Sequence, residues 1–436
     1  MKCNGELRMD KKAIAWLYDQ LPELVDKGII SAESAERLKK HYGSVAATTG
    51  TRTFLLVFGV IGALLVGLGI ILILAHNWEQ LTKLNRLMIS VGLLVVAQTA
   101  AGSVLWFKAD SPVWRETTAT LLMLMVGAAI ALVGQTYHLA ENADAFLRTW
   151  MLLSLPLMYL MNSVSVAVLY TIGVTVWAAG GYADISNQWI WVLFGLVLPY
   201  YRNLLQNNRY ANATVILSWV LTICFYFCFA AAFSQNLANL GMLIYSCLFA
   251  LTYLGGVLWF SGREGWMPFR PVGLAGSIFL TFLLTFHDIW SHLQVSRDAG
   301  SGVLYLFAAV LLALVIGGML RVRNNPGVRQ FALIPCVIGA GYLVQYFDGS
   351  GIGATLILNA YMLGLSISVI AAGVREYNLA KLNLGMFMMA ALIIARFFDM
   401  DVSFIVRGVL FVLAGIGFLV ANVVIVRRKA GGQHEK

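Results

Sequence analysis

The stretch FLLVFGVIGALLVGLGIILILA, residues 54–75, contains no charged side chain. About 20 apolar residues in helical form are enough to cross the hydrocarbon core of a bilayer. Similar runs recur along the chain of 436 residues, which is 60% hydrophobic and only 12% charged, whereas soluble domains average about 25% charged residues. The sequence therefore predicts an all-α polytopic membrane protein.

The apolar runs predict about 14 transmembrane helices, arranged as repeated helical hairpins. The segment 149–182 is ambiguous, because only Asn162 and Ser163 interrupt it; it fits one long span, two short spans or a re-entrant pair. With two spans there, the predicted helices lie at roughly 54–75, 87–107, 117–137, 149–161, 164–182, 188–201, 212–233, 240–260, 272–289, 302–320, 330–347, 352–373, 382–396 and 404–426.

The distribution of basic residues favours two spans in this segment. Lys and Arg prefer cytoplasmic loops, and the two-span reading places 24 of the 30 basic residues on one side, together with both termini. Counting a single span would move the basic turns after residue 200 and the C-terminal RRK (427–429) outside. We therefore expect cytoplasmic N- and C-termini, and we interpret the net charge of +9 as a topology signal and not as a nucleic-acid-binding surface.

The first 52 residues predict a short cytosolic amphipathic helical hairpin. Gly28 would end the first helix and Ser31 would cap the second. The hairpin could lie on the membrane surface or pack on loops of the protein. The alternative is that it docks a cytosolic or membrane protein partner. Two membrane modules follow, 53–185 with spans 1–5 and 186–436 with spans 6–14. The apolar face of the first helix comprises Ile14, Leu17, Tyr18, Leu21 and Val25.

Four segments of the first third share features with a known family. They are LVDKGIISAESAERLKKHYG (24–43), GALLVGLGIILILAHNWEQLTKLNRL (62–87), GQTYHL (134–139) and WMLLSLPLMYLMNS (150–163). Over about residues 10–170 the chain resembles the bacterial membrane-protein family known as domain-of-unknown-function family 2157. The resemblance implies a multipass protein of the bacterial inner membrane. That family is defined without a known reaction, so the resemblance assigns no catalytic residue.

The signatures of common enzymes are missing from the sequence. There is no Walker GxxxxGK[ST], HExxH, GxSxG or dinucleotide-binding motif. The five cysteines form no CxxC pair, and the histidines lack short-range metal-ligand spacing, so no cofactor or metal is expected. An enzyme acting on a lipid-linked substrate, with Glu79 or Asp288 as base, is the least favoured hypothesis.

Polar side chains gather at the predicted outer ends of the spans. Most of them follow odd-numbered spans, which all run outward and could converge at one periplasmic mouth. The aromatic members are also expected in an interfacial belt, whereas the charged and imidazole groups are not explained by a belt. The candidate binding residues are His76, Trp78, Gln135, Tyr137, His138, His287, Asp288, Asp348, Arg396 and Asp399.

Arg396 is the most informative candidate, because it follows the apolar run MFMMAALIIA. It either extends to the headgroups or forms an ion pair with Asp288, Asp348 or Asp399 in a polar cavity. Such a cavity would bind a small anionic substrate or a lipid headgroup. We therefore expect a transporter-like or lipid-handling protein, and the alternative is a membrane scaffold or assembly factor.

Two predicted spans contain a proline in mid-membrane. They are short, and they carry Pro156 and Pro199. Proline removes a backbone hydrogen bond and kinks a helix, and interrupted spans often mark transport sites. Both prolines therefore favour the transport hypothesis.

Overall fold

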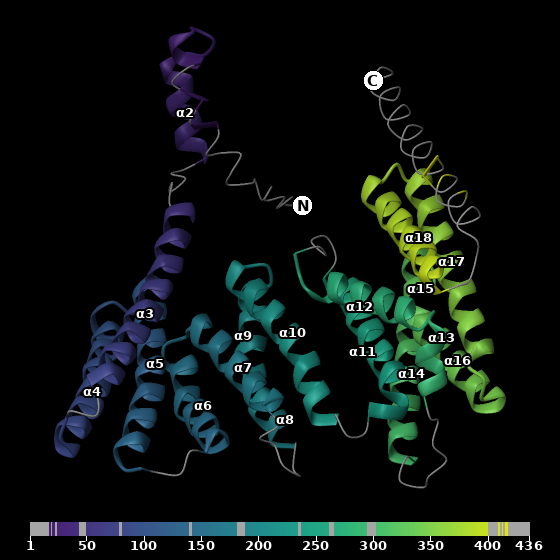
Figure 1. Ribbon diagram of the computed structural model, residues 1–436. Coiled ribbons are helices and arrows are strands. Elements are labelled where there is room, and N and C mark those ends of the chain that lie inside the picture. Colours follow the sequence, from purple (N-terminus) through teal and green to yellow (C-terminus); the bar gives the residue numbers. More distant parts are fainter. Residues whose placement is uncertain are drawn as a thin grey trace. The chain divides into compact units, whose positions relative to one another are not determined.

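Helices are the only regular elements in the described residues of the computed structural model (Figure 1), which confirms the predicted all-α class. Eight of these helices are long and apolar enough to cross a membrane, and three shorter apolar helices cover 54–69, 164–179 and 269–283. The count of fourteen spans remains a prediction, since most of 404–426 lies outside the described residues. The structure describes residues 17–18, 20–21, 24–42, 49–77, 81–138, 142–180, 188–233, 237–260, 266–293, 302–399, 409, 412 and 415–416.

The chain forms two compact units, Met1–Tyr170 (unit 1) and Thr171–Lys436 (unit 2). The boundary falls within α7, and the predicted module boundaries at 52/53 and 185/186 remain predictions. Unit 1 contains α2 (Ala32–Tyr42), α3 (Thr49–Asn77), α4 (Lys83–Phe107), α5 (Pro112–Thr136), α6 (Ala143–Leu160) and the start of α7 (Val164–Ala179). Unit 2 contains the rest of α7 and α8 (Gln188–Gly195), α9 (Leu198–Asn208), α10 (Asn212–Phe233), α11 (Leu237–Trp259), α12 (Phe269–Leu283), α13 (His287–His292), α14 (Gly302–Arg321), α15 (Pro326–Ala332), α16 (Ile334–Asp348), α17 (Ile352–Arg375) and α18 (Leu379–Asp399).

The turn before α2 has the predicted capping residues. Gly28 adopts φ +68° and its N–H donates to the Val25 carbonyl at 3.0 Å. The Ser31 hydroxyl accepts a hydrogen bond from Ser34 N at 3.2 Å, as an N-cap should. The hairpin as a whole remains a prediction, because residues 1–16 lie outside the described part of the chain.

Unit 1 is built around α5, which packs against α3, α4 and α6 (Figure 1). Glycines on α3 allow its close approach to α5. A methyl group at Gly59 would lie 2.5 Å from Thr117 Oγ1, and one at Gly67 would lie 2.9 Å from Leu124 Cδ1. Both contacts advance along the two helices in the same direction, so α3 and α5 run parallel and end on the same side of unit 1.

The ambiguous segment 149–182 forms two helices joined by a tight turn. α6 ends at Leu160 and α7 begins at Val164, and Asn162 between them adopts φ +46°. Pro156 lies inside α6 without ending it. Asn162 and Ser163 therefore separate two helices, and the reading of 149–182 as two membrane spans remains a prediction.

Unit 2 has α11 at its centre, packed against α12, α14, α15 and α16, and α17 packs against α16 and α18. Close helix approach again depends on glycine. A methyl group at Gly273 of α12 would lie 2.4 Å from Tyr253 N of α11, and one at Gly373 of α17 would lie 2.5 Å from Leu382 N of α18.

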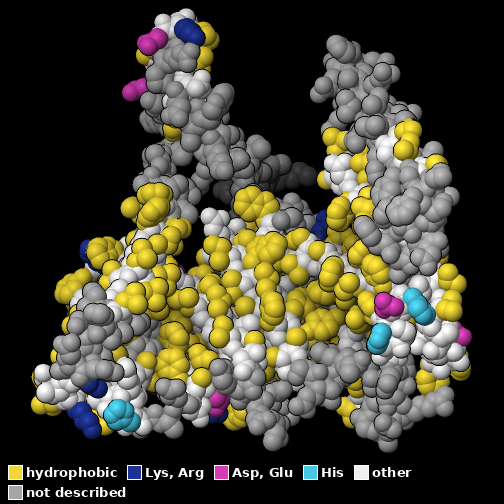
Figure 2. All heavy atoms as spheres, viewed as in Figure 1, with side chains coloured by type: hydrophobic (Ala, Val, Ile, Leu, Met, Phe, Trp, Pro, Cys, Tyr) yellow, Lys and Arg dark blue, Asp and Glu magenta, His cyan; other side chains and the backbone are white. Residues whose placement is uncertain are grey.

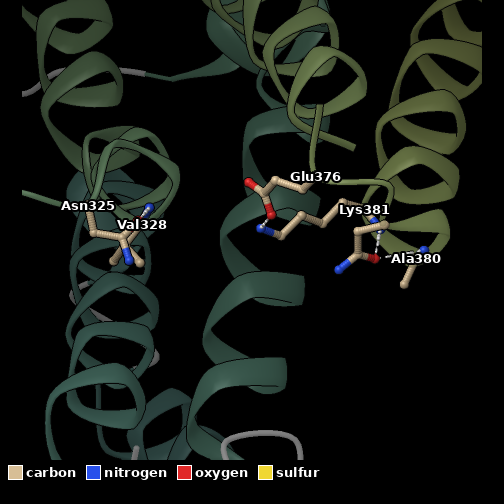
Figure 3. A network of polar contacts seen from close by, with 6 residues as sticks. Asn325, Val328, Glu376, Ala380 and Lys381 are labelled. Atoms are coloured by element: carbon tan, nitrogen blue, oxygen red, sulfur yellow. Dashed lines mark hydrogen bonds and ion pairs between the residues drawn. The ribbon is translucent and has the colours of Figure 1, made fainter. Parts of the chain in front are cut away.

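The turn between α17 and α18 is held by polar side chains (Figure 3). Asn378 Oδ1 accepts hydrogen bonds from Ala380 N at 3.0 Å and from Lys381 N at 3.2 Å, which caps α18. Lys381 also forms an ion pair with Glu376 across the turn. These groups hold a basic turn for which the sequence predicts a cytoplasmic location, and that location remains a prediction.

Three helical stretches of unit 2 are interrupted. Leu196 and Val197 separate α8 from α9, with Pro199 in the first turn of α9, and Leu333 separates α15 from α16. Residues 284–286 separate α12 from α13. The predicted span 272–289 is wrong near its end, because α12 ends at Leu283 and His287 and Asp288 begin a separate helix, α13.

Candidate functional site

The candidate residues divide between the two units. Gln135, Tyr137 and His138 lie at the end of α5 in unit 1, and the backbone of His76 lies in the last turn of α3. Since α3 and α5 are parallel, these four positions are at the same end of unit 1. Trp78 and the side chains of His76 and Asp399 are outside the described part of the chain. The remaining candidates, His287, Asp288, Asp348 and Arg396, belong to unit 2.

A cleft of about 770 Å³ opens between α5 and α6 in unit 1. We call it the unit 1 cleft. Gln135 and His138 line it, whereas Tyr137 is exposed and is not part of the lining. Its volume falls in the range of about 300–1,000 Å³ that is typical of small-molecule sites. The lining residues are Ile130, Ala131, Gly134, Gln135, His138, Asn142, Ala143, Ala145, Phe146 and Thr149.

The unit 1 cleft is bounded at one end by a close contact between α5 and α6. Trp150 of α6 packs on Gly127 of α5, where a methyl group would lie 2.6 Å from the indole ring. The Trp150 indole N–H also donates to the Met123 carbonyl at 2.8 Å, which fixes the crossing point of the two helices. Toward Gln135 and Asn142, small residues occupy the facing positions and the space between the helices stays open.

The walls and the rim of the unit 1 cleft differ in chemistry. Ile130, Ala131 and Phe146 supply apolar walls, while Gln135 and His138 supply an amide and an imidazole. The backbone of His138 lies in the left-handed region at φ +49°, which few non-glycine residues adopt and in which histidine is enriched. The cleft can therefore take a molecule that has an apolar part and a hydrogen-bonding part.

The side chains beside the rim are held in place by local bonds. Asn142 Oδ1 accepts from Ala145 N at 2.9 Å and caps α6, so the amide nitrogen of Asn142 is the group left to face a ligand. Asp144 and Arg148 form an ion pair on the next turn. The rim is therefore a set of positioned polar groups at the start of a helix.

The second set of candidates lies where α13, the end of α16, the start of α17 and the end of α18 meet. We call His287, Asp288, Gln345, Asp348 and Arg396 the polar end of unit 2. Figure 2 shows imidazole and carboxylate side chains gathered over α13 and α16, below an apolar surface that covers the middle of the helices. The antiparallel pairing of α17 with α18 brings Arg396 to this end.

Trp290 anchors α13 to the bundle. Its side chain is fully buried, its indole N–H donates to the Leu284 carbonyl at 2.8 Å, and its ring packs on Tyr342 with centroids 5.4 Å apart. Gly341 makes room for this ring, since a methyl group there would lie 2.9 Å from it. The bond to Leu284 closes the turn at 284–286, which explains why the helix breaks before His287.

Gln345 connects α16 to α13. It is 6% exposed, and its amide nitrogen donates to the Trp290 carbonyl at 3.1 Å. Its Oε1 atom is buried and has no hydrogen-bond partner among the described residues. An unsatisfied buried acceptor is unfavourable, so this oxygen is suited to a donor from water or from a ligand beside Gly351, where a methyl group would lie 3.4 Å from it.

The charged members of the polar end occupy different positions. The Arg396 guanidinium lies over the Phe286 ring, 5.0 Å from its centroid, next to the start of α13. Asp348 accepts a hydrogen bond from the Ser350 hydroxyl, and Asp288 and His287 are exposed. The structure thus brings these side chains to one end of unit 2, and their role as a binding site remains a prediction.

Sequence reasoning missed Glu116, the most highly bonded carboxylate among the described residues. It is 7% exposed on α5 and accepts hydrogen bonds from Val164 N at 2.8 Å, Ser165 N at 2.9 Å and Ser165 Oγ at 2.6 Å. Ser163 Oγ is a fourth donor. Glu116 therefore caps α7 from a distant helix, and a carboxylate there also complements the positive end of the helix dipole.

The comparisons with known proteins concern the same part of the chain. Residues 22–167 match the family model described as predicted membrane protein (DUF2157). The match confirms the resemblance and covers the DUF2157 segment from before α2 to the start of α7. Both Glu116 with its donors and the whole unit 1 cleft lie within this segment. Curated proteins and solved structures gave no match.

Proposed function

We propose that the protein is a lipid-handling membrane protein whose unit 1 cleft binds an amphiphile with an oxygen-rich head. The observation that carries this proposal is the division of the cleft into apolar walls and a polar rim. The apolar part of the ligand would lie against Ile130, Ala131 and Phe146. Its head would lie near Gln135 and His138, within hydrogen-bonding reach of the rim.

The chemistry of the rim selects the class of head. The Gln135 amide, the Asn142 amide nitrogen and the His138 imidazole are all able to donate hydrogen bonds. Oxygen acceptors such as phosphate or carboxylate complement such donors. The match to an anionic lipid head is therefore better than the match to an ammonium head.

Binding of a phospholipid tests this proposal. The full-length protein, purified in a mild detergent, would be titrated with a fluorescent phosphatidylglycerol and, separately, with a phosphatidylcholine analogue. We expect tighter binding of the anionic lipid, and Ala131→Trp, which fills the cleft, should weaken it at least about tenfold. Val96→Trp is the matched control, because Val96 lies on an exposed apolar face of α4.

Two further variants test the rim. Gln135→Ala and His138→Ala should each weaken phosphatidylglycerol binding by about three- to tenfold, the usual range for one hydrogen bond. Thr99→Ala, on the exposed side of α4, should leave binding unchanged. Equal affinity of the wild type, Ala131→Trp and both rim variants would contradict the proposal.

A further inference from the structure

A second cavity lies in unit 2, and its lining shares no residue with the polar end. It measures about 450 Å³ and is lined by α11, α14 and α16. We call it the tyrosine-rimmed cavity, after Tyr305 and Tyr346, whose rings belong to its lining. The proposed function does not involve this cavity, so the two can be tested separately.

Small side chains leave this space open. Ala308 and Ala309 of α14 face Gly339 and Ala340 of α16 across it. In membrane proteins, small residues normally permit close helix approach, as at Gly273, where a methyl group would lie 2.4 Å from the backbone of α11. At Gly339 the nearest atom to such a methyl group is 3.8 Å away, on the Leu243 side chain. Here the small residues border a void.

The cavity changes in polarity along its length. α14 and α15–α16 form an antiparallel pair joined by the short turn 322–325, so Tyr305 and Tyr346 lie at one end of the cavity. Toward the other end the lining consists of Leu312, Ile316 and Cys336. No Lys, Arg, His, Asp or Glu is among the residues described around it.

We infer that the tyrosine-rimmed cavity binds a single hydrocarbon chain with an uncharged, oxygen-bearing head, such as an alcohol or an ester. The chain would extend toward Cys336, and the head would lie between Tyr305 and Tyr346. Tyrosine suits this position, because its ring is apolar and its hydroxyl can donate to a carbonyl or hydroxyl oxygen. A carboxylate head is disfavoured, since the lining offers no cation.

The bilayer can supply such a chain from the side. α14 is the least buried of the eight candidate spans among the described residues. Leu306, Val310 and Leu314 on this helix are exposed. Ile316, Leu343 and Tyr346 of the lining are exposed as well, so the cavity opens to the surface beside α14 and a lipid chain can enter it there.

Cys336 provides a reporter at the deep end. Its thiol is partly exposed, whereas Cys224, Cys228 and Cys247 are buried. The full-length protein carrying Cys3→Ser would be reacted in detergent with N-ethylmaleimide, with and without 1-hexadecanol. We expect 1-hexadecanol to slow the labelling of Cys336 at least about tenfold, hexadecanoate to slow it less, and 1-butanol to have no effect.

Matched variants of α14 decide whether protection comes from the cavity. Ala309→Trp fills the cavity and should slow labelling without any ligand, while Leu314→Trp, on the exposed face of α14 that points away from the cavity, should behave as the parent protein. Ala309→Leu gives a milder version if the tryptophan variant does not fold. Undiminished labelling in 1-hexadecanol, or equal protection in the parent and in Ala309→Leu, would overturn the inference.

Discussion

Glu116 shows how a single side chain determines the path of the chain in unit 1. A buried carboxylate is costly unless hydrogen-bonded donors surround it. Glu116 meets this condition with two backbone and two hydroxyl donors from residues 163–165. In the sequence Glu116 is only one acidic residue near the start of an apolar run, and its partners follow it by 47 to 49 residues. The sequence alone therefore does not distinguish Glu116 from other acidic residues.

Removing the carboxylate should destabilise unit 1. Glu116→Ala leaves four donors at the start of α7 without their acceptor, and hydrogen bonds to charged groups contribute about 1.5–3 kcal/mol each. Because the turn can admit water, we expect a loss of about 3 kcal/mol, and a smaller loss of about 1–2 kcal/mol for Glu116→Gln. Reversible unfolding in sodium dodecyl sulfate measures both.

The exposed Asp110 is the control for this prediction. It lies in the turn before α5, and Asp110→Ala should shift the free energy of unfolding by less than about 0.5 kcal/mol. If Glu116→Ala were as stable as Asp110→Ala, the cap would have no structural role.

Gly351 offers a second prediction at this scale. It adopts φ +76°, and a methyl group there would lie 2.9 Å from Trp290 Cβ, whereas Gly349 at φ +66° has open space around it. Gly349→Ala should cost about 1–2 kcal/mol, for the left-handed backbone alone. Gly351→Ala should cost about 1–3 kcal/mol more, because it also displaces α13.

Tryptophan fluorescence separates these two glycine variants. The buried Trp290 should shift to the red in Gly351→Ala and stay unchanged in Gly349→Ala. Identical spectra and identical unfolding free energies for both variants would show that α13 does not depend on this contact.

At the scale of helices, the sequence predicts most elements correctly. It fails where the end of a helix depends on a side chain that is distant in the sequence. Apolar runs located the long helices, and Gly28, Ser31 and Asn162 marked turns through their local chemistry. α13 was not predicted, because the break before it depends on the Trp290 indole bonding to Leu284 and packing on Gly341. The same limit applies to the candidate sites. Polar side chains at helix ends indicate where to search, but the unit 1 cleft depends on how Trp150 spaces α5 from α6.

The packing of α17 on α18 gives a prediction for this scale. At Gly373 a methyl group would lie 2.5 Å from the backbone nitrogen of Leu382, and a backbone cannot move aside as a side chain can. Gly373→Ala should therefore destabilise unit 2 by about 1–3 kcal/mol. Gly364 lies on the same helix with open space around it, and Gly364→Ala should stabilise by about 0.5–1 kcal/mol through helix propensity.

The essential result is that Gly373→Ala lowers the free energy of unfolding and Gly364→Ala raises it. Thermal unfolding of both variants in the same detergent would show them directly. Two stabilising substitutions would mean that α17 and α18 are not in close contact at Gly373.

For the whole molecule, the arrangement of charge predicts which turns face which side of the membrane. The α6–α7 turn contains Asn162 and the α16–α17 turn contains Ser350, and both residues are exposed. The predicted topology places Asn162 in the cytoplasm and Ser350 outside. It also places the N- and C-termini on the cytoplasmic side of a bacterial inner membrane.

Cysteine labelling checks this arrangement in the full-length protein. In a background of Cys3→Ser and Cys336→Ser, a membrane-impermeant maleimide should label Ser350→Cys in intact spheroplasts. Asn162→Cys should be labelled only after permeabilisation. Labelling of both positions from the same side would contradict the reading of 149–182 as two spans in a fourteen-span chain.

The cap on α7 also constrains the order in which the chain is made and inserted. Val164 follows Glu116 by 48 residues, and at ribosomal speeds of about 5–20 residues per second this separates them by about 2–10 s. During that interval the carboxylate has none of its four donors, and an uncompensated charge resists entry into hydrocarbon. We therefore expect the start of α5 to stay at the water interface until the start of α7 emerges from the ribosome. Glu116, which does not line the unit 1 cleft, would then set the time at which unit 1 enters the membrane.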